Sequence, residues 1–535
     1  MAVAAPQARA PNVDVTITEL KKLFGDRVST AHAVREQHGK DISFHEAHLP
    51  DAVVFAESAE ECQQVVQICA RHKTPIIAFG TGTSLEGHIS APNGGVSLDV
   101  SRMNKVLAVN EADLDVVVQP GVTRKQLNEF IRATGLFFPI DPGADASIGG
   151  MTSTRASGTN AVRYGTMREN VLSLQVVTPD GRLMRLGRRS RKSSAGYDLV
   201  KLFVGSEGTL GIITEITLRL YGIPESMVSA TCAFENLEGA VSTVIQTIQS
   251  GIPVARIELM DTYTVDTVNK YSKLSLPNKN LLLLEFHGTE AGTKEQAEMV
   301  QAIAGENGGG DFAWTSQAEE RSKMWQARHD AAWAAKAAKP GWGMWATDVC
   351  VPISRLAECI LETQKDIVAS GLYAPIVGHV GDGNFHLTMM VDPDDPTYLP
   401  RAEGRPQTAR PGIDGRIETA IAVGLTARHD GLCTRSGQHG VHPLGKRLER
   451  RPLRVTATQH GIAQARRLPD QRTAPVQRGG DRLEREPRQQ RQQHQERQQR
   501  PDLQRPVGRR QLRPGPGGRA LLRGQQQGRG GQRCQ

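Results

Sequence analysis

Two histidines in the segment 377–386 are spaced so that they could bind one metal ion. Asp382-Gly383 lies between them and is a strong signal for a two-residue hairpin, because a type I′ turn needs positive φ at both central positions. Such a turn would place His379 opposite His386, with Cβ atoms about 4.5–5.5 Å apart. Two neutral imidazoles at that distance suit a divalent metal. The spacing alone fits two polar residues on a hairpin equally well.

Three loops rich in glycine, serine and threonine lie at 80–84, 143–165 and 205–212. The first follows an apolar strand pattern, and its glycines allow successive backbone N–H groups to form an anion-binding concavity. It is neither a P-loop, which needs Gly-Lys-Ser/Thr, nor a Rossmann fingerprint, which needs Gly-x-Gly-x-x-Gly at the start of a helix. One such loop is more often structural. Three in one chain favour a dinucleotide that lies along the backbone.

The elements that would position these loops alternate between strands and helices. Short apolar strands are expected at 53–55 and 75–79, with a helix over 59–71 that Ser58 and Glu61 begin as a capping box. Further strands are expected at 96–98, 106–109, 116–119, 171–178 and 212–220. A leading helical segment precedes them at 14–38.

From Gly222 the pattern changes to longer helices and strands, which predicts a second α+β domain. Helices are expected at 236–250, 291–305, 317–337 and 354–369, and strands at 254–259, 281–286 and 345–351. The predicted organisation is an N-terminal helical segment (1–45), a first domain (46–222), a second domain (223–445, atypical after about 400) and a low-complexity tail (446–535).

The charge of the chain is divided unevenly. Of 65 basic and 57 acidic residues, positions 401–535 hold 29 and 11, a net of +18, which leaves 36 and 46 before them, a net of −10. After Tyr398 the chain has no aromatic residue or methionine, and Arg, Gln, Pro and Gly dominate from about Leu468. Such a segment cannot bury enough apolar area to offset its ordering entropy, so it is expected to be disordered. A frame-shifted reading of a GC-rich gene would yield the same mixture, and the lack of aromatics to stack bases disfavours nucleic acid as a partner.

No apolar run approaches the roughly 18 residues that span a bilayer, and the first residues do not resemble a secretory signal. The seven cysteines are scattered without a Cys-x-x-Cys pair, which favours free thiols in a reducing compartment. These features predict a cytoplasmic protein, with peripheral attachment at the inner membrane left open.

The order and separation of the three loops resemble the flavoproteins of the vanillyl-alcohol oxidase / p-cresol methylhydroxylase superfamily, from about 45 to about 395. Within it, the segments 325–329, 347–352 and 378–386 are most similar to the FAD-dependent D-lactate dehydrogenases. The flavin-binding chains of glycolate oxidases and the D-2-hydroxyglutarate dehydrogenases are close relatives. The resemblance implies an α+β fold: a two-subdomain FAD-binding domain of the p-cresol methylhydroxylase type, followed by a substrate cap domain.

The resemblance also implies functional residues. The FAD pyrophosphate would lie on the first loop, at Gly80, Thr81, Gly82, Thr83 and Ser84. The rest of the cofactor channel would be lined by Pro142, Gly143, Ser147, Gly149, Gly150, Gly158, Gly165 and Ile212. Arg328 would bind the substrate carboxylate through its bidentate fork, although without the family it would be interpreted as a surface arginine.

By the same resemblance, His379 and His386 would bind a divalent metal (zinc, manganese or iron) that holds the 2-hydroxyl and carboxylate. The family's third ligand is a Glu in a Gly-Glu-His-Gly motif, whose His is the general base. The nearest match here is Gly437-Gln438-His439-Gly440, which makes His439 the candidate base and puts Gln in place of the ligand.

The implied reaction is oxidation of a small D-2-hydroxy acid, D-lactate to pyruvate in the first place, by hydride transfer to flavin N5. The electrons would pass to a cytochrome, a quinone or an electron-transfer flavoprotein, and a homodimer is compatible with the family. Glycolate or D-2-hydroxyglutarate remain alternative substrates. A chain that binds FAD but is catalytically impaired by its altered C-terminal sequence is a further alternative.

Overall fold

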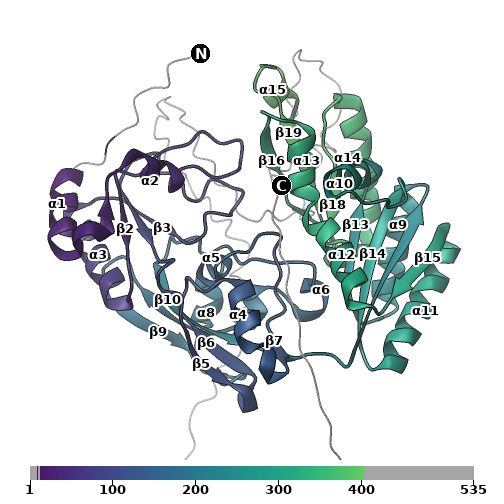
Figure 1. Cartoon of the computed structure of the whole chain (residues 1–535), viewed down its shortest axis with the longest axis horizontal. Helices are drawn as coiled ribbons and strands as arrows, with labels where there is room; N and C mark the ends of the chain where they lie inside the picture. Colours follow the sequence, from purple (N-terminus) through teal and green to yellow (C-terminus); the bar gives the residue numbers. More distant parts are fainter. Residues whose placement is uncertain (1–8, 10–11, 403–535) are drawn as a thin grey trace, which may run out of the picture. The chain divides into compact units, whose positions relative to one another are not determined.

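The computed structural model describes residue 9 and residues 12–402 (Figure 1). Its first sheet has the order β1 (Val28–Ser29), β2 (Ala52–Phe55), β4 (Val96–Asp99), β3 (Ile76–Phe79), with β2, β4 and β3 parallel. Two helices, α1 (Val13–Phe24) and α3 (Ala59–His72), bury their apolar faces in the same core as these strands. One of the two hydrogen bonds of the expected capping box is formed: the side chain of Ser58 accepts the N–H of Glu61. Since β1 pairs with β2, the described part of the N-terminal segment packs with this sheet.

A second, antiparallel sheet completes the N-terminal domain. Its order is β5 (Val106–Asn110), β6 (Asp115–Val118), β10 (Ile212–Arg219), β8 (Val171–Val177), β9 (Leu183–Gly187). Three helices pack on it through buried apolar residues: α4 (Arg124–Ile131), α5 (Ile148–Ser153) and α8 (Leu199–Phe203). The glycine-rich loops connect elements of these two sheets, so the sheets hold them in place.

The second domain is built on one antiparallel sheet with helices on both faces (Figure 1). The strand order is β15 (Gly309–Thr315), β12 (Ser226–Phe234), β14 (Asn280–Gly288), β13 (Val254–Met260), β18 (Ile376–Gly378), β19 (Asn384–Val391), β16 (Gly343–Ala346), and β17 (Val349–Cys350) also pairs with β19. This combination of sheets and helices confirms the α+β class predicted from the sequence.

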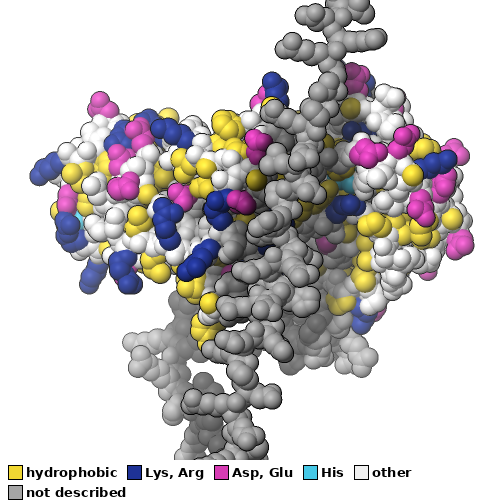
Figure 2. Space-filling model, turned by 90° about the horizontal axis from the view of Figure 1, so that it is seen from below, with side chains coloured by type: hydrophobic (Ala, Val, Ile, Leu, Met, Phe, Trp, Pro, Cys, Tyr) yellow, Lys and Arg dark blue, Asp and Glu magenta, His cyan; other side chains and the backbone are white. Residues whose placement is uncertain are grey.

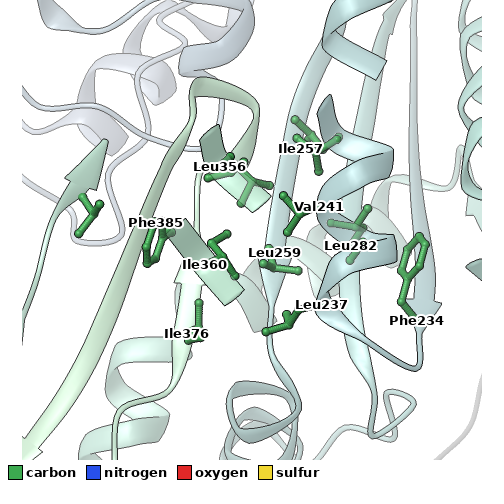
Figure 3. Packing of buried hydrophobic residues seen from close by; sticks show 14 of the residues in the cluster. Phe234, Leu237, Val241, Ile257, Leu259, Leu282, Leu356, Ile360, Ile376 and Phe385 are labelled. Atoms are coloured by element: carbon green, nitrogen blue, oxygen red, sulfur yellow. The ribbon is translucent and has the colours of Figure 1, made fainter. Parts of the chain in front are cut away.

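Alternation along the strands separates the two faces of this sheet. Leu282 and Leu284 belong to the core beneath α9 (Leu237–Gln249), α11 (Glu290–Glu306) and α14 (Leu356–Ser370). Figure 3 shows this core, with Leu237, Leu282 and Ile360 pointing into it from helix and strand. Leu281 and Leu283 face the other side, toward α10 (Thr262–Ser272), α12 (Ala318–His329) and α13 (Ala331–Ala338).

Two sequence expectations need adjustment. The helix expected over 317–337 is two helices, α12 and α13, which meet at Asp330; its carboxylate accepts hydrogen bonds from Gln326 and Ser272. The leading segment 14–38 contains two helices, α1 and α2 (His32–Gln37), separated by β1. The tail 446–535 and the segment 437–440 with His439 lie outside the described residues.

The surface of the described part carries both signs of charge. On the face drawn in Figure 2, Lys and Arg side chains are interspersed with Asp and Glu, and many apolar side chains lie between them. None of the helices among residues 12–402 combines the length and the apolar character needed to cross a bilayer.

Candidate active site

A cavity of about 500 Å³ is lined by all three glycine-rich regions, by the end of α12 and by the start of α13. The predicted cofactor residues in its wall are Gly80, Thr81, Gly82, Thr83, Ser84, Pro142, Gly143, Gly149, Gly150 and Ile212. The second domain contributes His329, Ala332 and Trp333. Ten of the thirteen predicted cofactor residues thus lie in this wall, and the part that α12 and α13 supply was not predicted.

The loop 80–84 offers unpaired donors to the cavity. It follows β3 directly, and Gly82 turns it with φ +63°, where a Cβ would press on the Phe79 ring. Within the described residues, the N–H groups of 81–84 donate to no protein acceptor. These residues are exposed or half-buried, and a row of N–H groups without a protein acceptor along a cavity wall suits an anionic ligand. These residues fit the pyrophosphate of a dinucleotide.

Three of the predicted cofactor residues shape the cavity without lining it. Ser147 is buried, and its Oγ accepts the N–H of Gly150 at 3.4 Å. Gly158 lies so close to the backbone of Asp141 that any Cβ would overlap it. Gly165 adopts φ +74° beside Glu169. Ser147 lies between the lining residues Ala146 and Gly149, and Gly158 lies against Asp141, which precedes the lining residue Pro142.

Two histidines in the wall have chemistry that a ligand could use. Burial, together with Arg328, Arg256 and Arg124, lowers the pKa of His329 to about 4, although Asp141 acts in the opposite direction. His329 is therefore neutral near pH 7. The Nε2 atom of His88 lies 3.1 Å from Glu207, while its Nδ1 is buried without a partner among the described residues. That nitrogen has almost no accessible surface, so it does not reach the cavity in this structure.

The hairpin expected at Asp382-Gly383 is not formed in the predicted register. The strand β18 ends at Gly378, a 3₁₀ turn covers Val380–Asp382, and only Gly383 has positive φ. In the observed ladder Val377, not His379, pairs with His386. A type I′ turn needs two residues with positive φ, and Asp382 adopts helical geometry instead.

The two imidazoles nevertheless come together. The ring centroids of His379 and His386 are 5.3 Å apart, with their planes at 84°. Nδ1 of His379 lies 2.8 Å from Glu258 Oε1, and Nδ1 of His386 lies 3.1 Å from the carbonyl oxygen of Thr347. Because both partners are acceptors, each Nδ1 carries the proton and each Nε2 keeps its lone pair, as metal ligands require.

The donor set is incomplete within the described residues. No group of three His, Cys, Asp or Glu that could hold a metal occurs there. Burial lowers the pKa of His386 although Asp348 opposes the shift, so the ring is held in the neutral form that a metal binds. His379 and His386 fit two positions of a metal site, and no third His, Cys, Asp or Glu is grouped with them among the described residues.

Arg328 is not the surface residue that its sequence context alone suggested. It is 8% exposed, and its Nε donates to Glu258 Oε2 at 2.8 Å. The same carboxylate also accepts from His379. The structure thus joins the predicted carboxylate-binding arginine and a predicted metal ligand through one residue that the sequence reasoning missed.

A second buried carboxylate on the same sheet was also missed. Glu285 on β14 accepts from Ser229, Trp325 and His287, at 2.7, 2.7 and 2.8 Å, and lies 3.4 Å from Arg256. Burial alone would raise the pKa of Glu285, but Arg256 and these donors lower it to about 2. A signal existed in the sequence: Arg256/Glu258 and Glu285/His287 are charged or polar pairs at i, i+2 in otherwise apolar strands.

Hydrogen bonds tie this face of the sheet to the cavity loops. Arg256 donates to Asn160 Oδ1 at 3.0 Å and lies 3.3 Å from Asp141, which precedes the lining residues Pro142 and Gly143. The hydroxyl of Tyr164 lies 2.8 Å from Nδ1 of His287. Glu285 is therefore linked through Arg256 and His287 to Asp141 and to Asn160 and Tyr164 of the second glycine-rich region.

Comparisons with known proteins agree with this arrangement. Residues 50–187 match the family "FAD binding domain", and residues 223–442 match "FAD linked oxidases, C-terminal domain". The chain is 49% identical to a probable mitochondrial D-lactate dehydrogenase of Danio rerio, over 82% of this chain and 86% of the relative. It is 44% identical to the mitochondrial D-lactate dehydrogenase [cytochrome] of Arabidopsis thaliana, over 79% and 73%.

A solved structure supports the predicted fold. Substrate-bound p-cresol methylhydroxylase superposes with a TM-score of 0.58 at 18% identity, over 73% of this chain and 85% of that one. The p-cresol methylhydroxylase type of FAD-binding domain, followed by a cap domain, is thereby confirmed.

The relatives contradict one expectation. Both are named mitochondrial, so the cytoplasmic location expected from the sequence was wrong. That expectation rested on free thiols and on the lack of a secretory signal. Neither feature separates the cytosol from the mitochondrial matrix, because both are reducing and neither is reached through the secretory route.

Proposed function

Since this chain belongs to the family of FAD-linked oxidases, we propose that it oxidises D-lactate to pyruvate and passes the electrons to a cytochrome. The observation that carries the proposal is a cavity of about 500 Å³ lined by the glycine-rich loops and by His329. The residue before His329 is Arg328, which shares the buried carboxylate of Glu258 with His379. The names of the relatives supply the substrate and the acceptor.

The first part of the proposal is the mode of FAD binding. The free N–H groups of the loop 80–84 would hold the pyrophosphate, and the segments 142–150 and 207–212 would line the remaining channel. Bound FAD supplies the two-electron redox chemistry that no side chain of the protein can supply. The protein contributes position, exclusion of water and electrostatics.

The second part is substrate binding. Arg328 would bind the carboxylate of the 2-hydroxy acid, because the guanidinium uses only its Nε toward Glu258 and keeps its terminal nitrogens for a ligand. A divalent metal held by His379 and His386 would orient the 2-hydroxyl and favour its loss of a proton. His439 would accept that proton and lies outside the described residues.

Flavin reduction tests the function directly. Purified protein should release FAD on heating, identified by chromatography, and under anaerobic conditions D-lactate should bleach its visible absorbance while L-lactate should not. Glycolate and D-2-hydroxyglutarate, offered in parallel, decide between the related substrates. FMN in the extract, or a flavin that none of these acids bleaches, would refute the proposal.

A second candidate is an FAD-binding chain that turns over poorly. The observation in its favour is Gln438 in the segment Gly437-Gln438-His439-Gly440, where the family motif has a metal-binding Glu. Full flavin occupancy with negligible bleaching would support it. Replacement Gln438→Glu that restores bleaching would assign the defect to the missing ligand.

A further inference from the structure

Glu258 is the one described residue that contacts both a proposed metal ligand and the proposed substrate clamp. We propose that Glu258 is a positioning residue, whose single carboxylate aligns the imidazole of His379 and the guanidinium of Arg328 with each other. The inference rests on the proposed function, since it assigns those two groups their roles. It adds a residue that neither the motifs nor the family resemblance identifies.

Strand register places Glu258 against His379. β13 pairs with β18 through Leu259↔Gly378 and Met260↔Val377, so the next position of the same ladder sets Glu258 opposite His379. Directly opposed residues on antiparallel strands point to the same face. The turn after β18 can approach β13 because Gly381 lies against Ile257 where any side chain would overlap. The strand register therefore brings the two residues together, and the hydrogen bond itself joins their side chains.

The contact with His379 selects one tautomer. A carboxylate only accepts hydrogen bonds, and Oε1 lies 2.8 Å from Nδ1 of His379. The proton must then sit on Nδ1, which leaves the Nε2 lone pair for a metal. Outer partners of this kind also fix the plane of the ring and make the imidazole more basic.

The contact with Arg328 orients the guanidinium, which is the second group that Glu258 holds. Oε2 lies 2.8 Å from Nε of Arg328, and the guanidinium makes no other hydrogen bond within residues 12–402. Holding the group by its Nε fixes the plane of the guanidinium and leaves its terminal nitrogens without a protein acceptor among the described residues. Because the two contacts use the two oxygens of one rigid carboxylate, the clamp and the ligand keep a fixed relative orientation.

Burial of the Glu258 carboxylate costs free energy, so stability of the fold alone does not explain a carboxylate at this position. Its side chain is 1% exposed, against 10% for Arg328 and 18% for His379. Taking such charges out of water costs several kcal/mol, and buried ion pairs often stabilise a fold no better than apolar residues of the same shape. Preorganisation of a site is a use that an apolar residue could not serve.

The substitution Glu258→Gln separates positioning from stability. Glutamine has nearly the same shape, but it has one acceptor oxygen and one NH₂ group, so it cannot accept from His379 and Arg328 together. We expect the full-length variant to keep its FAD, to bind zinc about 10–100-fold more weakly, and to show a raised KM for D-lactate with a reduced kcat. Zinc affinity is measured on metal-stripped protein by competition with a chromogenic chelator.

Glu285→Gln is the matched control. Glu285 is an equally buried carboxylate on the neighbouring strand, and it also lies beside a histidine, His287, and beside two arginines, Arg256 at 3.4 Å and Arg321 at 3.6 Å. This variant should lower the melting temperature as much as Glu258→Gln or more, while zinc affinity stays within about twofold of the unmutated chain. Equal loss of zinc affinity in both variants would assign the effect to general destabilisation and overturn the inference.

The outcomes distinguish the inference from the proposed function. If the unmutated chain binds zinc but no acid bleaches its flavin, the proposed function is wrong. In that case, zinc affinity that falls in Glu258→Gln but not in Glu285→Gln still supports positioning of His379 by Glu258. If D-lactate bleaches the flavin but Glu258→Gln leaves zinc affinity and KM unchanged, the function stands and the inference is wrong. A chain that binds no zinc, manganese or iron also overturns it.

Discussion

Two buried glutamates organise one face of the cap sheet. Glu258 holds Arg328 and His379, and Glu285 holds Arg256 and His287, each at hydrogen-bond or ion-pair distance. Burial of an unpaired carboxylate is costly, and both side chains lie at hydrogen-bond or ion-pair distance from at least one arginine. A polar network of this kind is rigid when complete and costly when any member is removed. Single substitutions should therefore have large and specific effects.

The metal ligands give the first residue-scale prediction. His379→Ala and His386→Ala should each weaken zinc binding by more than the roughly 10–100-fold that loss of an outer partner costs, while FAD stays bound. Because both histidines serve one ion, the double variant should be no worse than either single one. Chelator competition and flavin bleaching by D-lactate measure the two effects.

His32→Ala provides the control for that prediction. His32 is an exposed histidine on α2 whose closest acidic partner is Glu36, at 4.0 Å. Its loss should change neither zinc binding nor bleaching. Mild, additive losses for His379→Ala and His386→Ala would indicate that the two histidines are only polar residues of a turn.

Glu285 gives a prediction about pH. Its pKa is about 2 in the folded chain, against 4.5 for the free side chain, so the unfolded state binds more protons between those values. The stabilisation is fully present above pH 4.5 and is lost as the pH falls toward 2. At about 1.4 kcal/mol per pKa unit, the contribution is on the order of 3 kcal/mol.

The measurement compares the unmutated chain with Glu285→Gln by urea unfolding from about pH 6 to about pH 3, the range in which the linkage acts. Other carboxylates titrate in both proteins, so only the difference between the two free energies of unfolding is informative. That difference should shrink as the pH falls. A difference that stays constant over this range would show that Glu285 is not held ionised by Arg256 and His287.

At the scale of elements, the phosphate loop depends on backbone that only glycine adopts freely. Gly82→Val would force a side chain into φ +63° and against the Phe79 ring, and the backbone conformation alone costs about 1–2 kcal/mol. We expect the variant to fold but to carry little FAD, because the N–H groups of the loop lose their alignment. The ratio of flavin to protein absorbance measures occupancy.

Gly135→Val is the matched control for the loop. Gly135 has nearly the same conformation, φ +71°, in the same domain, and no atom lies within 4 Å of its added Cβ. It should lower stability by a similar amount and leave FAD occupancy unchanged. Equal loss of FAD in both variants would mean that the loop acts only through the stability of the domain.

The elements themselves were largely predictable, because strands and helices follow local patterns. The apolar stretch before Gly80 and the Ser58 cap both appear where the sequence placed them. Register was not predictable in the same way. Asp382-Gly383 signals a hairpin, but packing of the turn against β13 through Gly381 gives a 3₁₀ turn and puts His379 opposite Glu258. Long-range pairing of this kind leaves no mark in the local sequence around the turn.

The site was half predictable for the same reason. The loops 80–84 and 142–150 are evident from their composition, and the family resemblance supplied His379, His386 and Arg328. Glu258 and Glu285 become visible only as charges at every second position of apolar strands, a weak signal before the strands are known to be buried. The position of His329 in the cavity wall follows from where α12 ends, which is a matter of tertiary packing.

At the scale of the whole molecule, the chain divides by charge and by role. Every residue of the cavity wall lies between Ile42 and Trp333, and every described contact of Glu258 lies before 380. The candidate base His439 and the net charge of +18 lie after 400. Cofactor binding and turnover should therefore depend on different parts of the chain.

Truncation tests that division. A chain that ends after residue 410 keeps α15 (Tyr398–Ala402), and Tyr398 and Ala402 pack in the core of the second domain. It lacks His439 and most of the basic residues beyond 400. We expect it to carry FAD at the occupancy of the full chain and to bind zinc more weakly or not at all. Bleaching by D-lactate should fall by at least the roughly 10²–10⁴-fold that a general base supplies. Any RNA binding of the full chain should be salt-sensitive and should disappear with the tail. Undiminished bleaching by the truncated chain would show that the proton acceptor lies before residue 410 and that His439 is dispensable.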